Sequence, residues 1–506
     1  MSIIRLERIK GMSRKKKQLL NSISSLGYQI ILMVYSFIIP RFYIQYYGSQ
    51  VNGLIASINS FLGVISFMDL GIGAVIQSNL YKPLAEGDID QLSKIIISAK
   101  KFFSKIVGLY ILFLIIFIPV YTSGISEFDA LYTSSLIAIL AINLIVEYLF
   151  GIVNQCVLIA DQKGYVLHSL SSVLLVFIVV INSIMIMNHA SIQLVRLTYS
   201  VIISIKPIML YLYVRKKYKI NYKLVLSDEP IKQKWNGVAQ HVASYITTST
   251  DTIILTIFSS LSNVSVYYVY NLVVNGIKQI VSALMNGLEA LFGNMLAKGE
   301  KEYLSKKFYE LEWISHTAVT FLFSCAAALI RDFVLMYTVV NNDADYDQEL
   351  FGVLLSLAIA FWCIRTIYFA VVKAAGHYRQ TQTSSIIEMI INLSISIVVV
   401  FKYGLVGVAL GTLVAMIYRT TYLAKYINNI IPYDFRSFIK HVFIDMIVFI
   451  STVLISKMLK LNDSSLTFWL YKAFIIIFCC GMIELFINSL VYRKQMSVII
   501  QKIRRK

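Results

Sequence analysis

Long apolar segments separated by short polar segments fill the chain from residue 18 to residue 490. A helix needs roughly 20 apolar residues to cross a hydrocarbon layer of about 30 Å, and the segments have this length. The pattern therefore predicts an all-α polytopic membrane protein with about 14 transmembrane helices. The expected spans are 18–40, 49–76, 103–122, 131–158, 168–188, 193–213, 239–260, 263–292, 312–336, 349–375, 384–402, 404–427, 438–457 and 466–490.

Two boundaries between expected spans depend on short turn sequences. One lies at Ser259 to Asn263, and the other at Lys402 to Gly404. Small polar residues and glycine at these positions favour a turn within an apolar stretch that is too long for one span. Without these two breaks, the alternative is a count of about twelve or thirteen spans.

The positive charges lie between the apolar segments and alternate along the chain. The 46 Lys and Arg residues exceed the 27 Asp and Glu residues, which gives a net charge of +19. Because cytoplasmic segments are enriched in Lys and Arg, the alternation places both termini in the cytoplasm and requires an even number of spans. These basic segments are expected to meet anionic membrane lipids and not nucleic acid. They are 5–17, 82–105, 215–234, 298–307, 425–440 and 493–506.

An internal sequence match indicates a duplication. Residues 85–94 and 297–306, at an offset of 212, are identical at five positions, and Tyr165 lies opposite Tyr378 at an offset of 213. Both loops follow the second helix of a six-helix set, which favours two lobes related by a parallel repeat over chance convergence of two amphipathic loops. The expected parts are a basic N-terminus (1–17), an N-lobe (18–213), a basic linker (214–238), a C-lobe (239–427), two further helices (438–490) and a basic tail (491–506).

No motif for a cofactor, a metal or catalysis is evident. The five cysteines lie inside apolar segments without the spacing of metal ligands or of a disulfide framework. The outward loops are short, so no domain outside the membrane can house an active site. We therefore predict a protein that is not an enzyme and that needs no cofactor.

Charged residues within the spans are the candidate functional residues, because an ionised side chain at mid-membrane costs roughly 2.5 to 3.5 kcal/mol unless it faces a polar environment. An excess of deep cations favours a cavity for a phosphate or pyrophosphate, since guanidinium groups bind phosphate in a bidentate manner. The predicted substrate-binding residues are Arg365, Lys278, Lys206 and Arg41. The acidic residues predicted to couple transport to an ion, or to neutralise these cations, are Asp251, Glu147, Asp69 and Glu388.

Ion pairing between helices is the alternative for each of these residues. Asp251 and Lys278 lie on consecutive spans and are a candidate pair, whereas no acid is expected at the depth of Arg365 on a neighbouring span. Arg41 follows Pro40 among several tyrosines and is equally suited to anchor the helix at the membrane interface. Lys472, Asp445 and Glu484, in the last two spans, are expected to pair or to extend toward the interface.

The chain resembles the polysaccharide repeat-unit flippases of the multidrug/oligosaccharidyl-lipid/polysaccharide exporter superfamily, which serve O-antigen and capsule synthesis. The resemblance covers the whole length, including the span number and the duplication. The residues that carry it are Ser13 to Lys17, Pro40-Arg41, Tyr47-Gly48, Asn52 to Leu54 and Asp69 to Gly73.

The resemblance implies a carrier in the bacterial cytoplasmic membrane that works by alternating access, with an ion gradient as its driving force. Its substrate would be an undecaprenyl-pyrophosphate-linked oligosaccharide, moved from the inner to the outer leaflet. Membrane lipids and the polymerase and chain-length or export proteins of the same pathway are its implied partners. The alternatives are a drug or metabolite exporter of the same fold, which the cationic interior disfavours, and a membrane polysaccharide polymerase, which the short outer loops disfavour.

Overall fold

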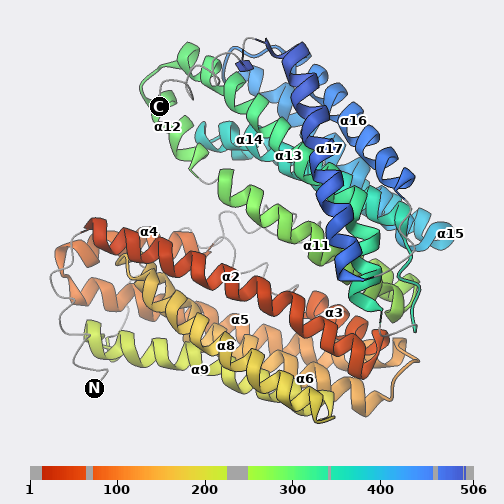
Figure 1. The fold of residues 1–506 in the computed structure, drawn as a ribbon. Helices are drawn as coiled ribbons and strands as arrows, with labels where there is room; N and C mark the ends of the chain where they lie inside the picture. Colours follow the sequence, from red (N-terminus) through yellow and green to blue (C-terminus); the bar gives the residue numbers. More distant parts are fainter. Residues whose placement is uncertain are drawn as a thin grey trace. The chain divides into compact units, whose positions relative to one another are not determined.

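The computed structural model describes residues 14–63, 72–224, 249–285, 287–339, 343–459, 465–493 and 495–496 (Figure 1). Within these ranges every regular element is a helix, and 11 helices are long and apolar enough to cross a membrane. The chain divides into two compact units, Met1–Tyr245 and Ile246–Lys506. The prediction of an all-α polytopic membrane protein is confirmed.

The first described helix of the first unit is the long helix α2, which packs along α8. The helices α3 and α4 correspond to the ends of the expected span 49–76, whose middle lies outside the described residues. The elements are α2 (Arg14–Tyr47), α3 (Ser49–Leu62), α4 (Ile72–Glu86), α5 (Ile89–Gly124), α6 (Ala130–Val146), η3 (Glu147–Gly151), α7 (Ile152–Ala160), α8 (Gly164–Met187) and α9 (Ile192–Tyr218).

Polar residues begin several of these helices where the chain leaves a loop. The side chains of Asp88, Asp129 and Ser191 accept hydrogen bonds from backbone N–H groups in the first turns of α5, α6 and α9. Such caps satisfy donors that have no partner within the helix. Between them the helices bury continuous apolar faces, such as the cluster around Ile96 and Phe103.

The second unit begins, within the described residues, with the short apolar helix Ser249–Phe258. This helix covers the end of the expected span 239–260; residues 239–248 lie outside the described part. The other elements are α11 (Leu261–Met285), α12 (Leu288–Ala297), α13 (Lys301–Thr338), α14 (Glu349–Ala374), α15 (Tyr378–Tyr426), η4 (Ile427–Asn429), α16 (Phe435–Met458) and α17 (Leu466–Val491).

Both predicted turn sequences interrupt helices in the structure. The helix Ser249–Phe258 ends before Ser260, whose hydroxyl accepts a hydrogen bond from the Asn263 N–H at 3.2 Å and so begins α11. The 49-residue α15 contains a non-helical residue, Gly404, with φ 51° and ψ −123°. Since only glycine adopts this backbone conformation easily, α15 is two helices joined at Gly404.

The two matching loops of the sequence repeat have the same backbone turn. Gly87 and Gly299 have φ values of 73° and 74°. The next residue in each loop, Asp88 or Glu300, donates its N–H to a carbonyl five residues earlier at 3.0 Å. This is the pattern by which a left-handed residue ends a helix, and a long helix, α5 or α13, follows in both cases.

In the second unit, α13 packs against several helices. It lies along α14, α16 and α17, and α14 also packs along α15 (Figure 1). The helices α16 and α17 are the two expected C-terminal spans. Their packing on α13 brings the charged residues of these spans into the interior of this unit.

Candidate functional site

In the first unit, the predicted residues Glu147 and Lys206 form an ion pair. The Lys206 Nζ lies 3.3 Å from Glu147 Oε1, and Gln155 donates a hydrogen bond to the same oxygen. Glu147 begins a five-residue π-helix, η3, in the middle of an expected span. Gly151, at the other end of η3, leaves room for the carboxylate, since a Cβ atom there would lie 2.6 Å from the Glu147 carboxyl carbon. Single π-helical turns of this kind are frequent at functional sites.

In the second unit, Lys278 and Arg365 lie beside the same indole ring. The Lys278 Nζ is 3.9 Å from the centroid of Trp362, and the Arg365 Cζ is 5.6 Å from it. Cations are attracted to the faces of aromatic rings, most strongly to tryptophan. Among the described residues, no carboxylate pairs with Lys278, so the charge pair proposed for Lys278 and Asp251 is not formed.

The carboxylate of Glu388 is shared by two arginines. Its Oε1 is 2.5 Å from Arg365 Nη1, and its Oε2 is 3.6 Å from Arg419 Nε. Arg419 also donates hydrogen bonds to the Thr381 carbonyl and to the Ser384 hydroxyl. Lys278, Arg365 and Arg419 therefore provide three cations against one acid, and this group of α11, α14 and α15 keeps a positive surplus.

The expectation that no acid lies at the depth of Arg365 is wrong. The helices α14 and α15 are consecutive and joined by a tight turn at Gly376, which has φ 71°. Glu388 follows this turn by about as many residues as Arg365 precedes it, so the two side chains reach the same level of the antiparallel pair.

Asp251 lies in a buried polar cluster that contains no cation among the described residues. Its side chain is 3% exposed, and Oδ2 accepts hydrogen bonds from the Tyr267 hydroxyl at 3.0 Å and from Thr412 Oγ1 at 2.7 Å. Asn392 donates to the same Thr412 hydroxyl at 2.9 Å. In the described part, Asp251 Oδ1 and Asn392 Oδ1 have no donor. Two buried acceptor oxygens without donors are costly unless a proton or a cation occupies the site.

The other charged residues singled out in the sequence are Arg41, Asp69 and three residues of the last two spans. Arg41 is exposed near the end of α2, and Asp69 lies outside the described residues. In the last two spans, Lys472 pairs with Asp332 of α13 at 2.7 Å. Asp445 pairs with a histidine of α13, and Glu484 accepts a hydrogen bond from Asn488, so these three residues do not pair with one another.

Sequence reasoning missed two buried arginines. Arg419 is 3% exposed and shares Glu388, although its position in the expected span 404–427 made it a candidate by the same criterion as Arg365. Arg196 is 6% exposed, lies between the rings of Tyr43 and Tyr199, and donates a hydrogen bond to the Tyr43 hydroxyl at 3.3 Å. Arg196 lies on α9 and Tyr43 lies on α2, so its hydrogen bond joins residues 153 positions apart in the sequence.

Comparison with solved structures identifies the fold. The chain is similar to the lipid II flippase MurJ in an inward closed conformation, with a TM-score of 0.70 and 15% identity over 94% of this chain and 100% of that chain. It is also similar to an inward-facing multidrug resistance MATE family transporter of the MOP superfamily, with a TM-score of 0.59 and 14% identity over 84% and 98% of the two chains. The eukaryotic MATE transporter AtDTX14 matches with a TM-score of 0.56 and 14% identity over 84% and 97%.

No protein-family model matches the sequence, and no curated protein matches it. At identities of 12 to 15%, the structural likeness shows the fold, which is that of the polytopic membrane transporters and flippases it matches. The chain is therefore a multi-pass membrane protein with the MurJ and MATE fold.

Proposed function

We propose that this protein is a flippase that moves an undecaprenyl-pyrophosphate-linked oligosaccharide from the inner to the outer leaflet of the bacterial cytoplasmic membrane. The observation that carries the proposal is the likeness to a lipid II flippase over the full length of that structure. The oligosaccharide would serve capsule, O-antigen or another surface polysaccharide, as the resemblance of the opening region implies.

The positive surplus of the second unit supports an anionic substrate. Within the described part of the chain, Glu388 is the one acid that pairs with the group of Lys278, Arg365 and Arg419, and the side chain of Arg365 remains 15% exposed. A pyrophosphate is negatively charged, so a cationic group of this kind can bind it, and a guanidinium can bind two of its oxygens at once. Lys206 is neutralised by Glu147, so we assign it a weaker role in binding the substrate.

Reconstitution tests the proposal directly. Purified protein in liposomes that contain an undecaprenyl-pyrophosphate-linked oligosaccharide should transfer the lipid between leaflets, measured by protection of its sugar from an impermeant glycosidase. We expect Lys278→Gln and Arg365→Gln to slow transfer about 10-fold or more, because each removes a charge-assisted bond of roughly 1.5 to 3 kcal/mol. Lys298→Gln is the matched control, since Lys298 is an exposed residue in the loop after α12. No transfer by the unmodified protein would refute the proposal.

Ion coupling at Asp251 is the second part of the proposal. The two unsatisfied oxygens of Asp251 and Asn392 are suited to take up a proton or a sodium ion. In the same liposomes, a proton or sodium gradient should accelerate transfer, and Asp251→Asn should abolish this acceleration. The rate without a gradient should stay within about 2-fold of that of the unmodified protein, a difference in activation free energy below about 0.5 kcal/mol. Equal acceleration of both proteins would remove Asp251 from coupling.

Export of a drug or metabolite is the second candidate, because MATE multidrug transporters have the same fold. Most cationic drugs would meet repulsion from Lys278 and Arg365. Uptake of a cationic dye by the same liposomes, without transfer of the lipid-linked sugar, would favour this candidate over the flippase.

A further inference from the structure

A hydrogen-bonded chain of titratable groups lies in the second unit and does not include the Glu388 or Asp251 clusters. Glu312 and His316 lie one turn apart on α13, Tyr368 lies on α14, and Asp445 lies on α16. The Tyr368 hydroxyl donates to Glu312 Oε1 at 2.7 Å and is 2.9 Å from His316 Nε2. His316 Nδ1 is 2.6 Å from Asp445 Oδ2. Hydrogen bonds therefore connect the two carboxylates without interruption.

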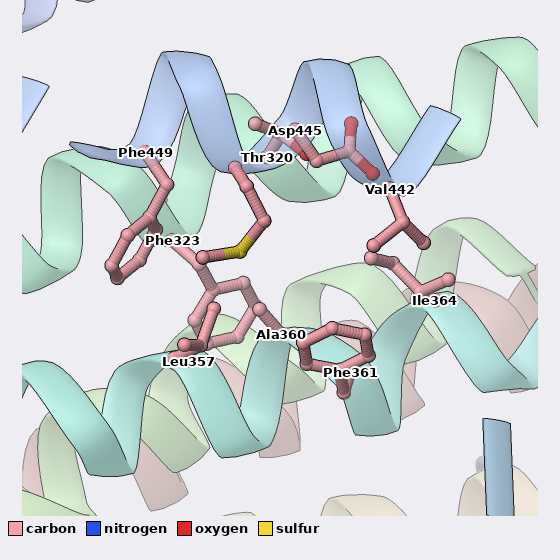
Figure 2. Close-up of a pocket in the computed structure, with 10 residues that line it drawn as sticks. Thr320, Phe323, Leu357, Ala360, Phe361, Ile364, Val442, Asp445 and Phe449 are labelled. Carbon is pink, nitrogen blue, oxygen red and sulfur yellow. The ribbon is translucent and has the colours of Figure 1, made fainter. Parts of the chain in front are cut away.

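The degree of burial differs between the two ends of this chain. Glu312 and Tyr368 are 0% exposed and His316 is 1% exposed, whereas the Asp445 side chain is 14% exposed. Asp445 lines a small pocket between α13, α14 and α16. Figure 2 shows Asp445 and Phe449 on one side of this pocket and Leu357 and Phe361 on the other. Among the described residues that line it, Asp445 alone is charged.

No lysine or arginine of the described residues pairs with either carboxylate. His441 Nε2 lies 3.8 Å from Glu312, and its ring stacks on His316 with 4.8 Å between the centroids. Two ionised acids in this interior are therefore balanced only by imidazoles. The other groups that face the chain are Lys440 on α16, Glu484 on α17, and the hydroxyls of Tyr433, Ser437 and Tyr492.

The same hydrogen bonds permit two arrangements of the protons. In the first, both acids are ionised and His316 is an imidazolium that donates to Tyr368 and to Asp445. In the second, Glu312 is protonated and donates to Tyr368, which donates to Nε2 of a neutral His316. Passage from the first to the second breaks the Nε2–H bond, forms a new O–H bond on Tyr368 and transfers the former Tyr368 proton to Glu312 Oε1. The number of protons is unchanged, and every hydrogen bond is retained.

We propose that Glu312, Tyr368, His316 and Asp445 form a proton-binding relay, which exchanges its proton with the surroundings at Asp445 and stores it between His316 and Glu312. Chains of Asp, Glu and His residues in membrane interiors commonly carry protons. The relay is separate from Asp251, and it connects α16 to α13 and α14. Proton binding here is independent of the proposed function; only its use to drive transport rests on that function.

Infrared difference spectroscopy of the purified full-length protein tests proton binding without a transport assay. As the pH is changed between about 5 and 9, a protonated-carboxyl band should appear that is absent in Glu312→Gln. Asp445→Asn removes the counter-charge of the His316 imidazolium, so we expect it to move the proton to Glu312 and to extend this band to a pH higher by about 1 unit. The absence of any band that depends on Glu312 would overturn the proposal.

Two tyrosines provide a matched test of the relay, because both donate to Glu312 Oε1 but only Tyr368 connects it to His316. Hydrogen–deuterium exchange of the Glu312 band should slow about 10-fold or more in Tyr368→Phe and remain unchanged in Tyr433→Phe, since only the first variant breaks the chain. Equal effects of the two substitutions would refute the relay. If Tyr368→Phe does not fold, the exchange rate of the Glu312 band in Asp445→Asn tests the relay instead. Loss of Asp445, where protons enter, should slow this exchange, and an unchanged rate would refute the relay.

Discussion

At the scale of single residues, Arg419 and Arg365 share the carboxylate of Glu388 but have different roles: Arg419 stabilises the fold, and Arg365 is a candidate substrate-binding residue. Arg419 is 3% exposed and is fixed by Glu388, the Thr381 carbonyl and the Ser384 hydroxyl, whereas the Arg365 side chain is 15% exposed. Removal of one partner of a buried ion pair leaves an uncompensated charge. The two arginines should therefore differ in what their loss affects.

We predict that Arg419→Gln lowers the free energy of unfolding by about 3 kcal/mol, because it leaves Glu388 with one cation and removes the hydrogen bonds that Arg419 donates to the Thr381 carbonyl and the Ser384 hydroxyl. Arg365→Gln should lower it by less than half as much and should mainly reduce transfer of the lipid-linked sugar. Thermal unfolding in detergent, followed by gel filtration of the surviving protein, measures the first effect. Equal losses of stability in the two variants would contradict the assignment.

The sequence was sufficient to find most of these charges but not their partners. The pair of Arg365 with Glu388 could have been predicted by counting outward from the turn at Gly376, since the two helices are consecutive. The contact of Asp251 with Thr412 could not, because it joins helices separated by 161 positions in the sequence. The relay was also beyond sequence reasoning: the sequence predicts that Asp445 pairs or extends toward the interface, but it does not indicate the histidine partner on α13.

At the scale of elements, the two halves of α15 are joined and packed by three glycines. Gly404 makes the turn, and Gly407 and Gly411 form a GxxxG sequence on the second half. A Cβ atom on Gly407 would lie 2.7 Å from the Val399 carbonyl carbon, and one on Gly411 would overlap Ser396. Small residues at this spacing allow two helix backbones to approach closely.

We expect Gly411→Val to lower the free energy of unfolding by about 1 to 3 kcal/mol, because the added methyl groups force the two halves of α15 apart. Gly293→Val in α12 is the control, since nothing lies within 4 Å of a Cβ atom there. Thermal unfolding of the two variants beside the unmodified protein measures the difference. A control that loses as much stability as Gly411→Val would show that helix propensity, and not packing, determines the result.

The sequence predicted the breaks between elements better than their interiors. The serine pair before α11 and the glycine within α15 are recognisable because few other residues favour those conformations. The π-helical turn at Glu147 has no such signature. The space for the Glu147 carboxylate is left by Gly151, which lies inside a continuous apolar segment.

At the scale of the whole molecule, the repeat and the charge alternation predict an orientation that has a direct test. The loops at Gly87 and Gly299 have the same turn and precede the long helices α5 and α13. We propose from this that the two six-helix lobes enter the membrane in the same direction. Both loops carry basic residues and are expected in the cytoplasm, whereas the loop between α5 and α6 carries acids and is expected outside.

Labelling of single cysteines in intact cells tests this orientation. The native thiols are replaced first; in the structure four of the five are buried and Cys479 is partly exposed. Ser126→Cys, an exposed position between α5 and α6, should react with a membrane-impermeant maleimide in intact cells. Lys298→Cys should react only after permeabilisation, and both should react equally in detergent. Labelling of Lys298→Cys in intact cells would show that this loop lies outside the cell. The predicted orientation would then be wrong, and these loops could not face a substrate in the cytoplasm.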